Sequence, residues 1–333
     1  MVIKRSPREA YAEALIKLGQ ERNDIVVFDA DLSTSTQTAK FGARFPNRFF
    51  NMGIAEANMM ATAAGMALSG KTVFASTFAV FATSRAYDQA RVAIGYSQAD
   101  VKIVATHGGI TVGEDGATHQ AIEDIALMRA MPNMRVLAPS DYQSTYSIIL
   151  KVAEERGPFY VRLTRVSLPD IYSEKESFEV GGGKLLKEGR DVTIVAEGPI
   201  VYEALSAAEI LSKEGISVEV IDAYSIKPLP EELILDSLSK TRKIVTAEDH
   251  SIIGGLGGAV AELISEKLPS PLKRLGVRDK FCCSGSASDL LRHVGLDADS
   301  IAREVKSFLD KFQYGHKNLS SQYNSFKRYY GEY

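Results

Sequence analysis

The chain has 333 residues, enough for two domains of about 100 to 200 residues each. Hydrophobic residues make up 45% and charged residues 24%, which are globular proportions that exclude a disordered chain, a coiled coil and a collagen-like repeat. The formal net charge is -3 and no run of Lys or Arg reaches the length of a basic arm or patch, so a nucleic-acid-binding protein is not expected.

Membrane, export and metal signals are weak in this sequence. The longest apolar stretch, residues 59–68, is too short for a membrane span of about 20 residues, and residues 1–7 lack the apolar segment of a signal peptide. The two cysteines, Cys282 and Cys283, are adjacent, so a disulfide between them would be strained, and two thiols alone do not form a metal-site pattern. We expect a protein of the reducing cytoplasm with no membrane contact and no metal ligands of its own.

Helix and strand patterns alternate along the first half of the chain. Ser6-Pro7-Arg8-Glu9 combines an N-cap serine with proline at the first helical position, and predicts a helix that runs through Leu18. The apolar run 25–28, followed by Asp29-Ala30-Asp31, predicts a buried parallel strand with polar residues at its carboxyl end. Further strands are predicted at 72–75, 101–105, 134–137 and 159–163, and helices at 54–68, 78–94, 121–130 and 140–155.

A second α/β unit follows a polar stretch. Residues 167–190 are irregular in pattern and contain the triplet Gly181-Gly182-Gly183, which favours a linker. Strands are then predicted at 192–196, 217–221 and 243–247, with helices between them. We therefore predict an α/β protein of two doubly wound domains, residues 1–166 and 191–312, and leave the tail 313–333 unassigned.

The segment 106–120 follows a predicted strand and gathers His107, His119 and Asp115 among four glycines. Ligand sites of doubly wound sheets lie at such strand ends, although a surface loop with glycine turns would have a similar composition. The three side chains are not at helical ligand spacing, which disfavours a metal site.

Two further segments could carry chemistry. Glu56 is a single carboxylate at the start of a helix otherwise built of Ala, Met and Thr; it either has a raised pKa through burial or complements the helix dipole. Phe78 and Phe81 lie three residues apart at a strand-to-helix junction, where they could stack on a flat ring or belong to the core. The segment 254–258 lacks the third glycine of a dinucleotide-binding motif and is interpreted as a tight helix entry.

Seven short motifs occur in a definite order: Asp29-Ala30-Asp31, Gly53-Ile54-Ala55-Glu56, Ser76-Thr77-Phe78, Arg85-Ala86-Tyr87-Asp88-Gln89, Gly113-Glu114-Asp115-Gly116, Pro139-Ser140-Asp141 and Glu248-Asp249-His250. In this order they resemble the transketolase family, from about Ser6 to Leu309. The resemblance implies a pyrimidine-binding domain that binds thiamine diphosphate, followed by a transketolase C-terminal domain.

The resemblance also implies roles for individual residues. Glu56 would hold the ring nitrogen of the thiamine aminopyrimidine and favour the tautomer that activates the cofactor, Phe78 and Phe81 would stack on that ring, and Asp31 would lie near the cofactor at a subunit interface. The catalytic residues implied are Glu56, His107 and His119. Arg8, Ser35 and Arg165 would hold the phosphate of the sugar substrate, and His107, Asp115 and His119 would contact the sugar itself.

The implied reaction transfers a two-carbon ketol unit from a ketose phosphate, such as xylulose 5-phosphate, to an aldose phosphate, such as ribose 5-phosphate, in the pentose phosphate pathway. Two positions depart from the family pattern: Ser84 stands where an aromatic residue is found in some members, and Ala117 where proline is common. Neither change removes a reactive group.

The sequence lacks the Gly-Asp-Gly motif with which the family's diphosphate-binding domain holds magnesium and the cofactor diphosphate. The pyrimidine half of the site alone would bind the cofactor weakly, because its charged diphosphate would lack the metal. We therefore expect one subunit of a split transketolase, completed by a separate N-terminal subunit that supplies the Mg²⁺ ligands, most simply as an α2β2 assembly.

Three alternatives remain open from the sequence. The β subunit of a 2-oxo acid dehydrogenase decarboxylase component has this architecture, but His107 and Arg165 favour transketolase. Deoxyxylulose phosphate synthase, normally one longer chain, is a minor option. A non-catalytic, transketolase-like binding subunit is disfavoured because Glu56, His107, Asp115 and His119 are all retained.

Overall fold

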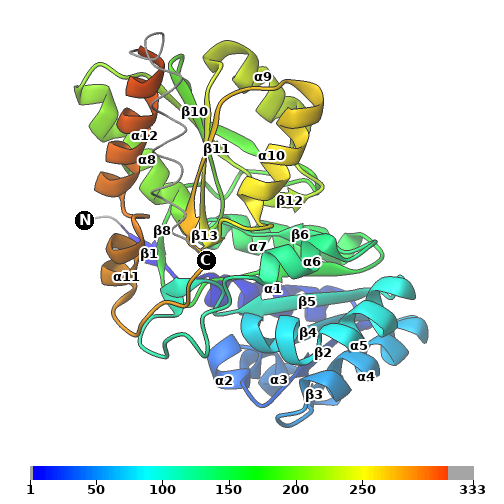
Figure 1. Ribbon diagram of the computed structural model, residues 1–333. Coiled ribbons are helices and arrows are strands. Elements are labelled where there is room, and N and C mark those ends of the chain that lie inside the picture. Colours follow the sequence, from blue (N-terminus) through cyan, green and yellow to red (C-terminus); the bar gives the residue numbers. More distant parts are fainter. Residues whose placement is uncertain (1–2, 314–333) are drawn as a thin grey trace.

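Two largely parallel sheets organise the computed structural model, which describes residues 3–313. The first sheet has seven strands in the order β12-β6-β7-β5-β4-β2-β3, and the second has five in the order β14-β13-β10-β11-β9. Within these two sheets all neighbours are parallel except β12 and β9, which pair antiparallel at the edges. The two α/β units occupy the lower and upper parts of Figure 1, which confirms the predicted fold class.

The elements of the first domain follow one another in this order: β1 (Lys4–Arg5), α1 (Pro7–Glu21), β2 (Ile25–Asp29), α2 (Ser33–Thr36), α3 (Ala39–Arg44), a 3-10 turn (Pro46–Arg48), β3 (Phe49–Asn51), α4 (Glu56–Leu68), β4 (Thr72–Phe78), a π-helical turn (Phe81–Arg85), α5 (Tyr87–Gln89), a second π-helical stretch (Ala90–Tyr96), β5 (Val101–Thr106), a 3-10 turn (Ile110–Val112), α6 (Asp124–Ala130), β6 (Arg135–Leu137), α7 (Tyr142–Glu154), β7 (Phe159–Arg162) and β8 (Leu168–Pro169).

The second domain follows: β9 (Lys184–Lys187), β10 (Val192–Ala196), α8 (Ile200–Lys213), β11 (Val218–Asp222), β12 (Ser225–Lys227), α9 (Glu231–Thr241), β13 (Ile244–Ser251), α10 (Leu256–Lys267), β14 (Leu272–Val277), α11 (Ala287–Val294) and α12 (Ala298–Gln313). None of the helices between residues 3 and 313 combines the length and the apolar composition that a membrane span requires.

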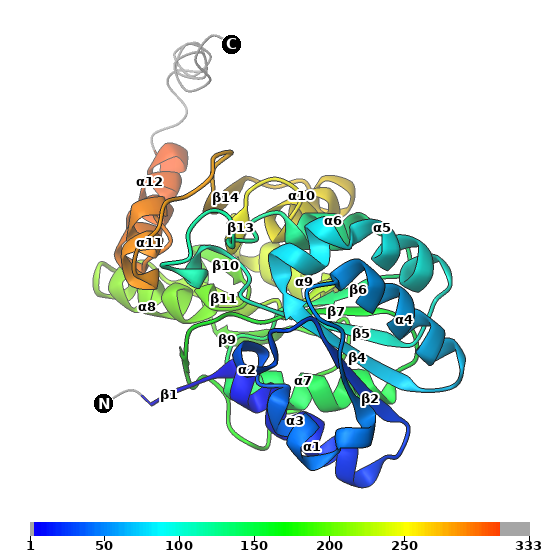
Figure 2. The same ribbon diagram turned by 90° about the horizontal axis from the view of Figure 1, so that it is seen from below.

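Both faces of the first sheet are buried, and the residues of β2 show why. Ile25 and Val27 pack into the core formed with α1 and α7, whereas Val26 and Phe28 pack into the core on the α4 side. Successive side chains of a strand point to opposite faces, so a continuous apolar run needs helices on both sides. Figure 2 shows α1, α3 and α7 on one face of this sheet and α4, α5 and α6 on the other.

The second sheet is covered in the same way. Alternate residues of β10 take part in two cores: Val192 and Ile194 pack with α8 and α12, and Val195 packs with α9 and α10. The domains are also joined through the chain itself, because β12 leaves the second domain and pairs with β6 of the first sheet. The segment predicted to be an irregular linker contains two short strands: β8 pairs with β1, and β9 forms an edge of the second sheet.

Local details differ from the predicted elements. Helix α1 does not end before Gly19, and the Ser6 side chain makes no capping hydrogen bond. Gly19 lies inside the helix. A residue with a Cβ would not fit there, because that atom would come within 2.5 Å of the Phe45 ring. Strand β4 extends to Phe78, and the predicted single helix over 78–94 consists of two π-helical stretches joined by α5. The segment 254–258 is a tight helix entry as predicted.

Candidate functional site

Sequence-predicted site residues gather along the carboxyl-terminal edge of the first sheet. Strands β7, β5, β4 and β2 are neighbours in that order. Asp31 follows β2, Phe78 ends β4, His107 directly follows β5 and Arg165 comes shortly after β7. Because parallel strands end at one edge, residues far apart in the chain become neighbours there.

Glu56 is the first residue of α4 and only 1% exposed. Its carboxylate accepts two hydrogen bonds from Arg85 Nη1, at 3.0 and 3.2 Å. The Arg85 side chain is 51% exposed, and its guanidinium carbon lies 4.7 Å from the centre of the Phe81 ring. Glu56 is therefore buried and also stands in the first turn of α4, so both features considered from the sequence are present. One arginine, which sequence reasoning did not assign to the site, holds it.

Four rings form a continuous wall near this carboxylate. Phe78 and Phe81 are stacked with centroids 5.8 Å apart and an interplanar angle of 12°. Phe78 also stacks on His107 at 3.7 Å, and His119 meets the edge of Phe81 at 5.6 Å. The wall thus brings together both predicted aromatic residues and both predicted histidines, and offers flat faces to a planar ligand.

His107 is buried in an uncommon backbone conformation, with φ at 62°. Its Nδ1 lies 2.8 Å from Thr106 Oγ1. Burial, and then the positive charges of Arg8 and Arg165, lower the pKa of His107 to about 3. The imidazole is therefore neutral at pH 7 and can donate or accept a hydrogen bond without carrying a charge.

We expect the imidazole NMR signals of His107 to stay unchanged between pH 8 and pH 5, because its pKa is about 3 in the folded chain. The unfolded chain binds a proton at this ring below about pH 6.5, so this histidine lowers stability as the pH falls from there toward 3. A His107→Asn variant identifies the signals in the spectrum. A titration midpoint near pH 6.5 for these signals would contradict the expected burial.

Arg8 and Arg165 form the positively charged part of the site. Arg8 Nη1 donates to the backbone oxygen of Ser35 at 2.9 Å, while its buried Nε has no hydrogen-bond partner among residues 3–313. Burial, and then the positive charge of Arg165, lower the pKa of Arg8. Arg165 Nη1 donates to Val112 O at 2.6 Å and to Glu114 at 2.9 Å. Two neighbouring guanidinium groups with spare donors suit a phosphate.

The remaining predicted residues are more exposed. Asp31 has φ at 64° and accepts a hydrogen bond from Asn51 Nδ2 at 3.0 Å, which fixes the turn after β2. Asp115 is exposed on the loop 107–120, on the same loop as the two histidines. The structure therefore leaves Asp115 free to meet a ligand that enters from solvent.

A carboxylate of the second domain holds the loop 107–120 in place. The sequence did not predict this contact. Asp249, on β13, accepts hydrogen bonds from Ile110 N at 2.8 Å, Thr111 N at 3.3 Å and Thr111 Oγ1 at 2.7 Å. At Gly109, with φ of 77°, a Cβ would come 2.1 Å from Asp249. Glycine at this position allows the close approach that binds the loop to the second domain.

Arg162 lies beneath the loop and is almost fully buried between the domains. Its Nε donates to Asp124 at 2.7 Å, and its Nη2 donates to the backbone oxygens of Ala121 and Asp249 at 3.1 and 2.8 Å. The buried Glu197 lies 3.7 Å from Nη1, and burial raises the pKa of Glu197 to about 7. One guanidinium therefore connects carboxylates of both domains to the end of the loop.

The helix entry at 254–258 offers no phosphate site. The backbone amides of Leu256 and Gly257 donate to the carboxylate of Glu248, at 2.7 and 2.9 Å. This carboxylate occupies the helix N-terminus, where an anion would otherwise bind. The structure agrees with the interpretation of this segment as a structural turn.

Comparisons with known proteins converge on one family. Residues 4–170 match the transketolase pyrimidine-binding domain, and residues 181–301 match the transketolase C-terminal domain. A Methanocaldococcus jannaschii protein named for a transketolase C-terminal section is 52% identical over 312 residues, which cover 93% of this chain and 98% of that protein.

Two further comparisons concern chain organisation. Human transketolase is 38% identical over 312 residues, which cover 92% of this chain but 50% of that enzyme. A solved structure described as a split gene transketolase in an inactive beta4 tetramer has a TM-score of 0.86 and 50% identity, and covers 92% of this chain and 98% of that chain. The chain thus matches a separate section over nearly its whole length, and one half of the single-chain enzyme.

Proposed function

Because the chain belongs to the transketolase family, in its pyrimidine-binding and C-terminal domains, we propose that it is the catalytic C-terminal subunit of a thiamine diphosphate-dependent transketolase. The observation that carries this proposal is the buried carboxylate of Glu56, which Arg85 links to the stacked rings of Phe78 and Phe81. A buried acceptor next to a flat aromatic surface fits a protonated, planar heterocycle.

The residues present fit one part of the cofactor. Glu56 would accept a hydrogen bond from the aminopyrimidine ring, and Phe78 and Phe81 would stack on its face. Thiamine diphosphate, when bound, supplies the carbanion chemistry that a protein side chain cannot. The sequence has no Gly-Asp-Gly motif for the diphosphate and Mg²⁺, so these ligands are assigned to the partner subunit.

The other site residues would bind and orient the sugar phosphate. His107, which is neutral, would hydrogen-bond the oxygens of the sugar together with His119, and Asp115 would bond a hydroxyl group. Arg8 and Arg165 would bind the phosphate, with Ser35 at the same end of the site. The two-carbon ketol unit would pass from a ketose phosphate to an aldose phosphate while these groups hold the carbon chain.

We further propose a separate N-terminal transketolase subunit as partner, in an α2β2 assembly within the cytoplasm. Two observations support the partner: the chain spans half of human transketolase, and it matches a separate split-gene subunit along 98% of that chain's length. That split gene transketolase is described as an inactive beta4 tetramer. Its inactivity agrees with the expectation that such a chain alone lacks half of a site.

The test is ketol transfer by this chain, alone and mixed with a candidate N-terminal subunit, with xylulose 5-phosphate, ribose 5-phosphate, thiamine diphosphate and Mg²⁺. We expect sedoheptulose 7-phosphate from the mixture and none from either chain alone. Equal product from this chain alone would overturn the split assembly. Release of carbon dioxide from a 2-oxo acid, without ketol transfer, would assign the chain to the dehydrogenase β subunits.

Replacing Arg8 with Gln is expected to raise the KM for xylulose 5-phosphate by about 10- to 100-fold, the effect of losing a hydrogen bond to a charged group. The value of kcat should change little, because Arg8 contacts the end of the substrate remote from the reacting carbons. Unphosphorylated xylulose is the matched control, and its kcat/KM should be the same for both proteins. If the Arg8→Gln variant lost the same factor in kcat/KM with xylulose 5-phosphate and with xylulose, Arg8 would not bind the phosphate.

A further inference from the structure

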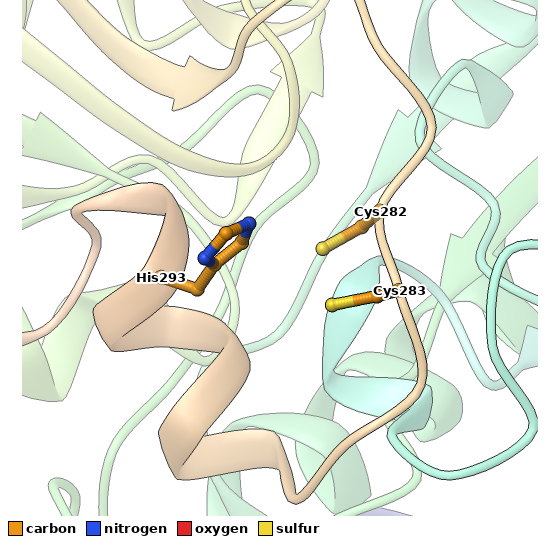
Figure 3. A group of neighbouring side chains, drawn as sticks. All are labelled: Cys282, Cys283 and His293. Atoms are coloured by element: carbon orange, nitrogen blue, oxygen red, sulfur yellow. The ribbon is translucent and has the colours of Figure 1, made fainter.

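Folding brings three metal-ligating side chains together outside the site described above. Cys282 and Cys283 lie in the segment 278–286 between β14 and α11, and His293 lies in the last turn of α11. Their ligand atoms all lie within 4.8 Å of one another, and this is the one such group of His, Cys, Asp or Glu side chains within residues 3–313. Figure 3 shows both sulfur atoms pointing toward the imidazole ring.

The two sides of this cluster are positioned independently. Ser286 caps α11 by accepting a hydrogen bond from Asp289 N at 3.2 Å, and Leu290 buries the helix against a small apolar cluster. Cys282 packs against the same cluster from the preceding segment. The helix thus fixes the backbone of His293 and the apolar contact fixes Cys282, while Cys283 and His293 remain exposed to solvent. An entering ion therefore needs no opening of the core.

The donor set suits a soft divalent cation. Zn²⁺ binds Cys sulfur at about 2.3 Å and His nitrogen at about 2.0 to 2.1 Å, so two sulfurs on one tetrahedral ion are about 3.8 Å apart. From a separation of at most 4.8 Å, the side chains need to close by about 1 Å at most. Two thiolates also balance the charge of a dication.

A disulfide fits this pair less well than a metal. Adjacent residues have Cα atoms about 3.8 Å apart across a trans peptide, whereas disulfides usually need about 4.4 to 6.8 Å. Both cysteines are free thiols in the structure. The reduced pair, with the histidine opposite, is therefore the arrangement that the chain favours.

We propose that Cys282, Cys283 and His293 bind Zn²⁺, with water as the fourth ligand on the solvent side. The site is distinct from the proposed cofactor site and does not depend on the proposed function. It lies against the loop 107–120: Gln120 Nε2 donates to the backbone oxygen of Cys283 at 3.1 Å, and a Cβ at Gly116 would come 2.4 Å from Ser284 Oγ. Bound Zn²⁺ would hold the segment 278–286 to α11 and so support this loop.

Binding is measured with the full chain, reduced and stripped of metal by a chelator. Zn²⁺ titrated against a chromophoric chelator should occupy one site per chain. Co²⁺ should produce a thiolate-to-metal charge-transfer band, and this band can arise only at Cys282 and Cys283 because the sequence has no other cysteine. Absence of the band, or of a Zn²⁺ site, would overturn the proposal.

Single substitutions identify the ligands. Cys282→Ser, Cys283→Ser and His293→Gln should each weaken Zn²⁺ binding by more than about 100-fold, because even the outer partners of metal ligands contribute about 10- to 100-fold. Arg292→Gln, on the same helix, is the matched control and should bind Zn²⁺ like the parent chain. Unchanged affinity in Cys283→Ser or His293→Gln, both at exposed positions, would overturn the ligand assignment.

The contact with the loop has its own readout. Hydrogen exchange of the backbone amides in residues 113–120 should slow when Zn²⁺ is bound, because the metal suppresses local opening of the segment against which they pack. The Cys282→Ser chain should show no such change. Equal rates of amide exchange with and without Zn²⁺ in the parent chain would contradict the proposal that bound Zn²⁺ supports this loop.

Discussion

Replacing Glu56 with Gln is expected to lower the ketol-transfer kcat of the proposed two-subunit enzyme by about 10²- to 10⁴-fold, the usual contribution of a positioned acid-base group. Glu56 is 1% exposed, and Arg85, which donates to its carboxylate, lies over the ring of Phe81. Gln keeps the size of the side chain but cannot hold a negative charge opposite the ring of the cofactor.

The measurement is kcat with saturating cofactor, together with the Kd of thiamine diphosphate and the urea midpoint of the variant. Glu262→Gln is the matched control, since Glu262 pairs with Arg129 on the exposed surface. It should leave kcat unchanged. A Glu56→Gln enzyme with the parent kcat would remove this residue from the mechanism, even if the family assignment stood.

Replacing Arg162 with Met is expected to lower the free energy of unfolding by about 3 to 5 kcal/mol, the effect of removing one partner from a buried ion pair. The change leaves the fully buried carboxylates of Asp124 and Glu197 without their cation. It also removes two hydrogen bonds to backbone oxygens near the end of the loop 107–120. Both stability and ketol transfer should therefore fall.

The destabilisation should depend on pH in a defined direction. Burial already raises the pKa of Glu197 to about 7 with Arg162 present, and removal of the cation raises it further. A group whose pKa is raised on folding stabilises the folded chain at low pH, and this contribution is lost as the pH rises. The difference in free energy of unfolding between the Arg162→Met variant and the parent chain should therefore be smaller at pH 5 than at pH 8.

Urea unfolding at the two pH values checks this expectation. Arg162→Lys retains the charge but loses the planar fork, and should lie between the parent and Arg162→Met. Arg292→Gln, which removes a pair whose side chains are both 68% exposed, should cost at most about 1 kcal/mol. If Arg162→Met and Arg292→Gln lowered the free energy of unfolding equally, the ion pairs of Arg162 with Asp124 and Glu197 would not join the domains.

Patterns among residues close together in the chain are sufficient to predict several features of the site. The apolar run of β2, followed by Asp29 and Asp31, correctly predicted a buried strand with polar residues at its carboxyl end. The spacing of Phe78 and Phe81 allows both rings to lie on one side, where the structure stacks them on each other, although a π-helical turn replaces the expected α-helix after Phe78. A π-helical turn and an α-helix bury apolar residues at similar spacing, so the sequence pattern does not distinguish them.

The sequence by itself determined which segments form two α/β units, because apolar periodicity is a property of residues adjacent in the chain. Only the tertiary structure decided which distant groups meet: Asp249 with Ile110, 139 positions away, and Arg162 between carboxylates of both domains. The sequence predicted no metal ligands, and the place of His293 opposite the two thiols follows from the packing of α11. Such contacts depend on how elements pack in three dimensions, which no local period specifies.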